Sequence, residues 1–209
     1  MREPTGTKDL ASAALFAALT AVGAYVAVPM FGVVPFTLQV LVVLLCGLVL
    51  GARLGVLSML AYVGLGLVAP VYAGGTSGLG VLFGPAGGYI WGFVVATFVV
   101  GTIMERVKPR RLIGLTLTAL AGLVPIYALG ATWLALQIDL SFSVAVWVGV
   151  VQYLPADLAK AVIAGSLVRA LRETPVSLPS LRTEVRVGHR RRPMKPQAGV
   201  AMKGAEVEK

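Results

Sequence analysis

Residues 38–69 read LQVLVVLLCGLVLGARLGVLSMLAYVGLGLVA. As one α-helix these residues would be about 48 Å long, whereas the hydrocarbon core of a bilayer is about 30 Å thick. A single straight membrane span is therefore excluded. Arg53 lies between Gly51 and Gly55 in the middle of the stretch. The pattern predicts two short spans joined by a tight turn, with Arg53 at the cytoplasmic surface.

The same apolar character extends over most of the chain. Of its 209 residues, 57% are hydrophobic and 13% are charged, and the mean hydropathy is +0.87. A soluble domain carries about 25% charged residues, so a large water-soluble catalytic domain is excluded. Further apolar runs cover residues 10–28, 85–104, 112–137 and 142–171. The last run is too long for one helix, and Pro155 is a natural first residue for a final helix over 155–171. We predict an all-α integral membrane protein with six transmembrane helices.

The charges predict the orientation. The formal net charge is +9, and eight of the 18 basic residues follow Glu173. By the positive-inside rule, the N-terminus, Arg53, the loop 106–111 and the tail face the cytoplasm. We therefore expect a multi-pass protein of the cell membrane with both termini cytoplasmic. Anionic lipid headgroups are the expected partners of the basic clusters. Nucleic acid is not expected, because no aromatic residue interleaves residues 190–192.

This topology divides the chain into three parts. They are a cytoplasmic N-terminus over residues 1–9, a membrane domain over residues 10–172, and a basic, disordered cytoplasmic tail over residues 173–209.

Residues 70–89, PVYAGGTSGLGVLFGPAGGY, fall on the outer side in this topology. Glycines let a backbone approach a ligand closely, and irregular backbone at membrane depth occurs where it lines a cavity. The alternative is a flexible external loop. The neutral and aromatic residues between the glycines favour an outward loop that lines a ligand pocket, and we expect residues 70–83 of it to be non-helical.

Asp157 and Lys160 are the only charges between Ser141 and Val168. An ionisable residue at the centre of a span costs about 2.5–3.5 kcal/mol, so its presence needs a reason. The i,i+3 spacing places the two side chains on one helical face, within reach of each other. They form either a structural ion pair or an anchor for a polar ligand, and we favour the ligand anchor.

The sequence lacks the signatures of an enzyme. Its single histidine, His189, lies in the predicted tail, and no GxxxxGK[ST] motif is present. We therefore expect no catalytic residues, no metal site and no cofactor. In the first span, Ala14 with Ala18 and Ala17 with Ala21 form two small-residue stripes of the kind that lets helices pack closely. The sequence does not choose between them.

Five segments occur in an order that resembles a known family. They are PFTLQVLVVLL, LGARLG, PVYAGG, GPAGGYIWGF and LPADLAKA, at residues 35–45, 50–55, 70–75, 84–93 and 154–161. Together they resemble the BioY family, the biotin-specific substrate-binding (S) components of energy-coupling factor (ECF) transporters. The resemblance covers residues 10–171.

The resemblance implies a six-helix protein that captures biotin at its outer end. It also implies a transmembrane coupling protein and two cytoplasmic ATPase subunits as partners. A solute carrier or channel that works without ATPases is the alternative. Ala14 and Ala18 are implied as the coupling-protein contact. The residues implied at the biotin site are Gln39, Tyr72, Gly74, Gly75, Gly88, Tyr89, Asp157 and Lys160.

Overall fold

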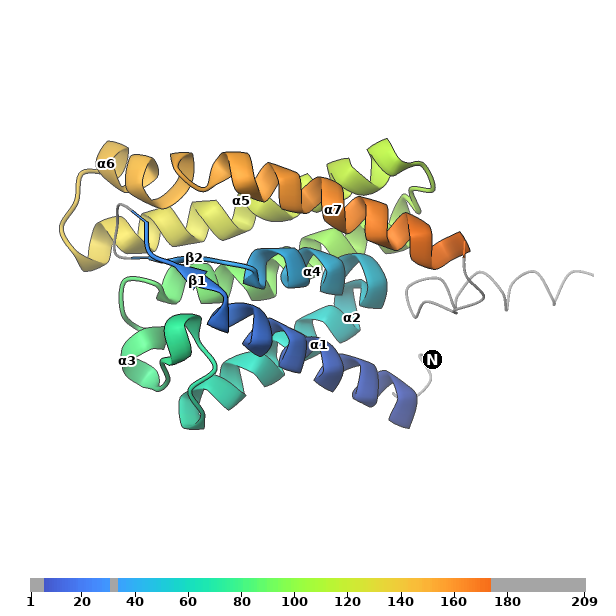
Figure 1. Cartoon of the computed structure of the whole chain (residues 1–209), viewed down its shortest axis with the longest axis horizontal. Helices are drawn as coiled ribbons and strands as arrows, with labels where there is room; N and C mark the ends of the chain where they lie inside the picture. The colour runs from blue at the N-terminus through green and yellow to red at the C-terminus, as the bar shows by residue number, and fades with distance from the viewer. Residues whose placement is uncertain (1–5, 31–33, 174–209) are drawn as a thin grey trace, which may run out of the picture.

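The computed structural model describes residues 6–30 and 34–173. Long helices run side by side and make up most of the molecule (Figure 1). The long helices are α1 (Thr7–Tyr25), α2 (Gln39–Val68), α4 (Gly87–Arg106), α5 (Leu112–Gln137) and α7 (Leu154–Glu173). The all-α fold is thus confirmed for the part of the chain that the structure describes. Residues 1–5 of the predicted N-terminus and 174–209 of the predicted tail lie outside it.

Short elements gather at one end of the helices, on the left of Figure 1. Two of them, β1 (Ala27–Val28) and β2 (Phe36–Thr37), pair in antiparallel register between the end of α1 and the start of α2. The others are η1 (Ala73–Gly75), α3 (Leu79–Leu82), α6 (Phe142–Val146) and η2 (Trp147–Val151). This end therefore carries the irregular backbone of the fold.

Helix α2 is folded back on itself. Gly51 leaves the helical conformation with φ 79° and ψ −177°, a left-handed φ that glycine adopts without strain. The amide Nε2 of Gln39 lies 2.5 Å from the Tyr62 hydroxyl, whereas a straight helix would separate these residues by about 34 Å. The two halves of α2 are therefore antiparallel, and the predicted turn beside Arg53 is confirmed.

The end of α4 holds this turn in place. Glu105 accepts a hydrogen bond from the backbone N–H of Ala52 at 2.8 Å, which satisfies an amide exposed by the break at Gly51. Gly101 permits the close approach, because a Cβ at residue 101 would lie 2.2 Å from the Ala52 nitrogen. Small residues at helix contacts are the usual means of close packing in membranes.

The segment between α2 and α4 contains more helix than the sequence predicts. The sequence predicts no helix over residues 70–83, but they contain η1 and α3. Leu82, which is 4% exposed, anchors the α3 turn in the core. The amide of Gly78 bonds to the Gly66 carbonyl at the end of α2. Tertiary contacts therefore impose a turn on a glycine-rich stretch that has no helical propensity of its own.

The last apolar run contains two helical pieces. Residues 142–151 form α6 and the π-helical η2, and a bend of 45° separates them from α7. Helix α7 begins at Leu154, one residue before the predicted start at Pro155, and ends at Glu173, two residues after the predicted end. Pro155 thus lies in the first turn, where its missing N–H costs no helical hydrogen bond.

The number of membrane spans is a separate question. Among the described residues, α2, α4 and α5 are long and apolar enough to cross a membrane, with the α6–α7 pair as a possible fourth span. The count of six includes α1 and treats the two halves of α2 separately, and it stays a prediction.

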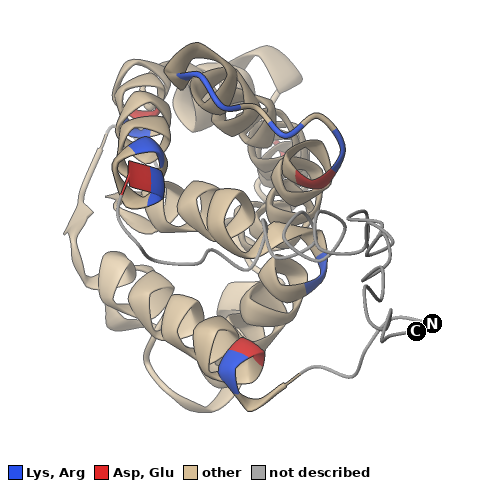
Figure 2. Cartoon of the chain, turned by 90° about the vertical axis from the view of Figure 1, so that its right-hand side faces the viewer, with Lys and Arg blue, Asp and Glu red and all other residues tan. Residues whose placement is uncertain are grey.

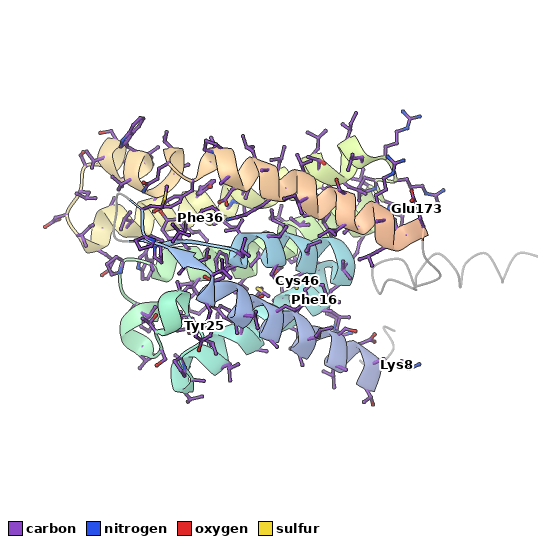
Figure 3. All side chains as sticks on the ribbon, in the orientation of Figure 1. Lys8, Phe16, Tyr25, Phe36, Cys46 and Glu173 are labelled. Atoms are coloured by element: carbon purple, nitrogen blue, oxygen red, sulfur yellow. The ribbon has the colours of Figure 1, made fainter. Side chains whose placement is uncertain are left out.

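Most charged residues of the described chain lie at the end opposite the short elements, and Figure 2 views this end. Lys8 and Glu173 mark it on the right of Figure 3. The α2 turn with Arg53 and the basic loop that follows α4 meet there, because Glu105 bonds to Ala52. The topology prediction requires the basic residues of these segments to cluster at one end of the molecule, and they do.

We predict that Gly51→Ala destabilises the protein. Alanine at φ 79° is strained, and its Cβ would lie 2.6 Å from the Glu105 carboxylate. The matched control is Gly64→Ala in the same helix, where a Cβ meets nothing within 4 Å. There alanine should be neutral or stabilising by about 0.4–1 kcal/mol. Thermal unfolding in detergent measures both variants, and equal midpoints would contradict the role given to the Gly51 turn.

Candidate ligand-binding site

A pocket lies among the helices, toward the end that carries the short elements. Phe36, labelled in Figure 3, marks its position between the helices. Its lining comes from the segment before α2, from α2, α4, α5 and α7, and from the connections before α4 and α7. The lining residues are Val34, Pro35, Phe36, Thr37, Gln39, Val40, Tyr62, Ala73, Val81, Ala86, Tyr89, Ile90, Phe93, Ile126, Tyr127, Tyr153, Asp157 and Lys160.

Asp157 and Lys160 form an ion pair in this lining. The Lys160 ammonium lies 2.6 Å from Oδ1 of Asp157, and the two side chains are 5% and 4% exposed respectively. The ammonium also donates to the Thr37 carbonyl at 2.6 Å and lies 3.7 Å from the centre of the Phe36 ring. The pair thus ties α7 to the β2 segment.

The second carboxylate oxygen of Asp157 is also partnered. It accepts a hydrogen bond from the Tyr127 hydroxyl at 2.6 Å. Hydrogen bonds to charged groups are shorter and stronger than neutral ones. Because Tyr127 belongs to α5, this contact fixes the carboxylate between two helices.

Gln39 forms the centre of a second polar group. Its Oε1 accepts from the Thr37 hydroxyl at 3.0 Å, and its Nε2 donates to the Tyr62 hydroxyl. Tyr62 in turn donates to the Val71 carbonyl at 3.2 Å. The amide of Gln39 is therefore held in one orientation, with one N–H and one oxygen lone pair left for a ligand.

Two further tyrosines use irregular backbone as hydrogen-bond acceptor. Tyr89 donates to the Gly149 carbonyl in η2 at 2.9 Å, and Tyr153 donates to the Val34 carbonyl. A buried phenol needs such a partner, and π-helical segments often occur at functional sites. These hydrogen bonds hold the two aromatic rings in place along the wall of the pocket.

The structure brings together four of the eight residues assigned to the site. Gln39, Tyr89, Asp157 and Lys160 all line the pocket. The predicted contact between Asp157 and Lys160 is confirmed. A direct role in holding a ligand stays a prediction for all eight residues.

The other four residues lie outside the lining. Tyr72 is fully buried behind Tyr62, with ring centres 5.6 Å apart, and its hydroxyl donates to the Val63 carbonyl. Its neighbour Ala73 lines the pocket instead. Gly74 and Gly75 adopt positive φ angles in η1, which lets the loop turn there.

Gly88 serves helix packing. A Cβ at this position would lie 2.3 Å from the Cβ of Trp133, so α4 and α5 meet closely there. The motif GPAGGY therefore contributes Ala86 and Tyr89 to the pocket, while Gly88 allows the helix contact.

The sequence model described as the BioY family matches residues 1–175. The chain belongs to the BioY family. It is 45% identical over 158 residues to a probable biotin transporter BioY of Pyrococcus horikoshii, across 75% of this chain and 91% of that relative. It is 39% identical over 170 residues to the biotin transporter BioY of Thermotoga maritima, across 81% and 98% respectively.

A solved structure shares the fold. It is the crystal structure of an S-component for biotin from an ECF-type ABC transporter. The two chains superpose with a TM-score of 0.76 at 26% sequence identity, across 83% of this chain and 95% of the other. The resemblance inferred from the five sequence segments is therefore confirmed.

Sequence reasoning missed several residues of this BioY pocket. They are Phe36, Thr37, Tyr62, Tyr127 and Tyr153. The three tyrosines interrupt apolar runs, and a hydroxyl within such a run needs a hydrogen-bond partner. That pattern could have indicated them. No comparable pattern indicates Phe36 and Thr37, because their position depends on how β2 meets α7.

We predict that the buried ion pair is cooperative. Lys160→Met leaves the Asp157 carboxylate without its counter-charge, and such a loss costs about 3–5 kcal/mol. Replacing Asp157 by leucine in the same chain removes the orphaned charge, so the double variant should be more stable than Lys160→Met alone. Unfolding of the ligand-free protein in detergent measures the difference.

The matched control lies on the same helix. Arg169 and Glu173 form an ion pair with side chains 56% and 69% exposed, and an exposed pair contributes about 0–1 kcal/mol. Arg169→Met should therefore change the unfolding midpoint little. If the stability losses of the two single variants simply added in the double variant Asp157→Leu/Lys160→Met, the pair would not be cooperative.

Proposed function

We propose that this chain is the membrane-embedded S component of an ECF-type transporter and captures biotin at the outer face of the membrane. Its relatives are named biotin transporters. The solved structure that shares its fold is an S-component for biotin. The observation that carries the proposal is an aromatic pocket whose floor is a buried Asp–Lys pair.

The chemistry of the pocket suits biotin. The fused rings of biotin present two ureido N–H donors and one carbonyl. The Asp157 carboxylate can accept from an N–H, and Gln39 keeps both a donor and an acceptor for a ligand. Aromatic side chains such as Tyr89 and Phe93 supply apolar surface for the rings. A mostly apolar pocket with a few placed polar groups is the usual form of a small-molecule site.

The proposed topology has six spans and both termini in the cytoplasm. The six spans are α1, the two halves of α2, α4, α5 and α7. The positive-inside rule assigns the end with Lys8, Arg53 and the loop 107–111 to the cytoplasm. The pocket then opens outward, where an importer meets its substrate.

Energy for release and transport comes from partners in this proposal. The sequence has no P-loop, so a transmembrane coupling protein and two cytoplasmic ATPases would supply it. The docking face is the exposed stripe of α1. Ala14 and Ala18 are exposed, whereas Ala17 and Ala21 are 5% and 7% exposed and pack inside the protein. The burial of the second stripe favours Ala14 and Ala18 as the contact.

We predict that both charged pocket residues contribute to biotin affinity. Asp157→Asn and Lys160→Met should each weaken equilibrium binding of biotin to the purified protein by about 10- to 150-fold. This range corresponds to the loss of one hydrogen bond to a charged group, about 1.5–3 kcal/mol. Unchanged affinity in the double variant Asp157→Leu/Lys160→Met would assign the pair to structure alone. No detectable biotin binding by the wild-type protein would overturn the proposed function.

We predict that Ala14→Trp/Ala18→Trp blocks transport without affecting capture. Two tryptophans would hold a partner helix several ångströms away, while the pocket stays intact. Biotin binding should persist, and ATP-dependent uptake and co-purification with partner subunits should fail. Leu15→Trp/Leu19→Trp is the matched control, because these exposed positions already carry large side chains. Normal uptake by the Ala14→Trp/Ala18→Trp variant would favour a carrier that works alone.

A further inference from the structure

The pocket carries no net charge. Asp157 and Lys160 are the only charged residues among those that line it, and they neutralise each other. The connecting segments at this end add no cation. Residues 26–38, 70–86 and 138–153 contain no Lys or Arg, and their one charged residue is Asp139. Within the described part of the chain, Lys160 is thus the only cation that a pocket ligand can reach.

The ammonium of Lys160 already contacts protein groups on three sides. An ammonium has three N–H donors. One faces Asp157 and one faces the Thr37 carbonyl, both at 2.6 Å. The Phe36 ring covers a third side at 3.7 Å. A ligand anion would have to displace one of these contacts.

An anion beside Lys160 would also lie close to the carboxylate of Asp157. Like charges repel strongly where the surroundings are apolar. A neutral urea group avoids this repulsion, because it donates N–H to Asp157 and requires no counter-charge. The floor of the pocket therefore favours the ring end of biotin over its carboxylate end.

Burial fixes the direction of the ligand. The floor residues Gln39, Asp157 and Lys160 are 2–4% exposed. Val34 and Ala73, on the other hand, are only partly buried and neutral. A ligand with its rings on the floor points its side chain toward this half-open rim, where a charged or a neutral end group keeps its own hydration and needs no partner from the protein.

We propose that this site recognises biotin by its ring end alone, so that neutral biotin amides and esters are ligands as good as biotin itself. The proposal rests on the proposed function, since it assumes that biotin occupies this pocket. It extends the substrate class to biotin joined through its carboxyl group to another group, as long as that group fits past the rim.

Equilibrium binding to the purified full chain tests the proposal with three ligands: biotin, its primary amide, and lipoic acid. The amide should bind within about threefold of biotin. Lipoic acid carries the same acid side chain without the ureido ring, and it should bind at least a hundredfold more weakly. Amide binding that is tenfold or more weaker than biotin binding would overturn the proposal. No binding of biotin would overturn the proposed function itself.

Lys160→Met and truncation after Glu173 serve as controls on the ratio of the affinity for the amide to the affinity for biotin. If either Lys160 or a basic residue of the tail held the carboxylate, the wild type would prefer biotin, and the corresponding variant would lose that preference. We expect a ratio near one in all three proteins, with weaker overall binding in Lys160→Met. A preference for biotin that disappears in either variant would overturn the proposal and identify the residue or segment that holds the carboxylate.

Discussion

The ion pair between Asp157 and Lys160 is the interaction on which the pocket end of the molecule depends. Each charge alone would be costly inside a membrane, by about 2.5–3.5 kcal/mol on insertion scales. Together with Tyr127 and the Thr37 carbonyl they form a group in which every charged atom has a partner. These contacts join α5, α7 and the β2 segment. The same side chains therefore form the polar floor of the pocket and hold these elements together.

The irregular backbone at this end follows a similar requirement, because buried polar groups need hydrogen-bond partners. Polar backbone groups at membrane depth must find partners within the protein. The carbonyls of Val34, Val71 and Gly149 accept hydrogen bonds from Tyr153, Tyr62 and Tyr89 respectively. The tyrosines thereby satisfy loop carbonyls and present their rings to the pocket at the same time. The same hydrogen bonds therefore fix the aromatic walls of the pocket and satisfy the irregular backbone at this end.

The two ends of the molecule have different physical roles. At the charged end, Gly51, Gly101 and Glu105 close a tight helical turn against the end of α4. At the other end the two charges of the pocket lining cancel, and aromatic side chains line the space. Between them, the exposed stripe of α1 is continuous with the β1–β2 pair that leads to Thr37. In the proposed function, biotin capture and partner docking therefore use different parts of the molecule, the pocket and the exposed stripe of α1.

The sequence by itself determined the membrane class, the turn beside Arg53 and the pairing of Asp157 with Lys160, because hydropathy, length and helical spacing are local properties of the chain. It also determined the family, through five short segments in order. Only the tertiary structure decided which glycines serve packing and which residues line the pocket. Gly88 lies against Trp133, and Phe36 covers Lys160, which is 124 residues away in the chain. Such contacts depend on where helices cross, and no local pattern records that. The same reason applies to α1, where two alanine stripes look alike in sequence and only the position of α2 buries one of them.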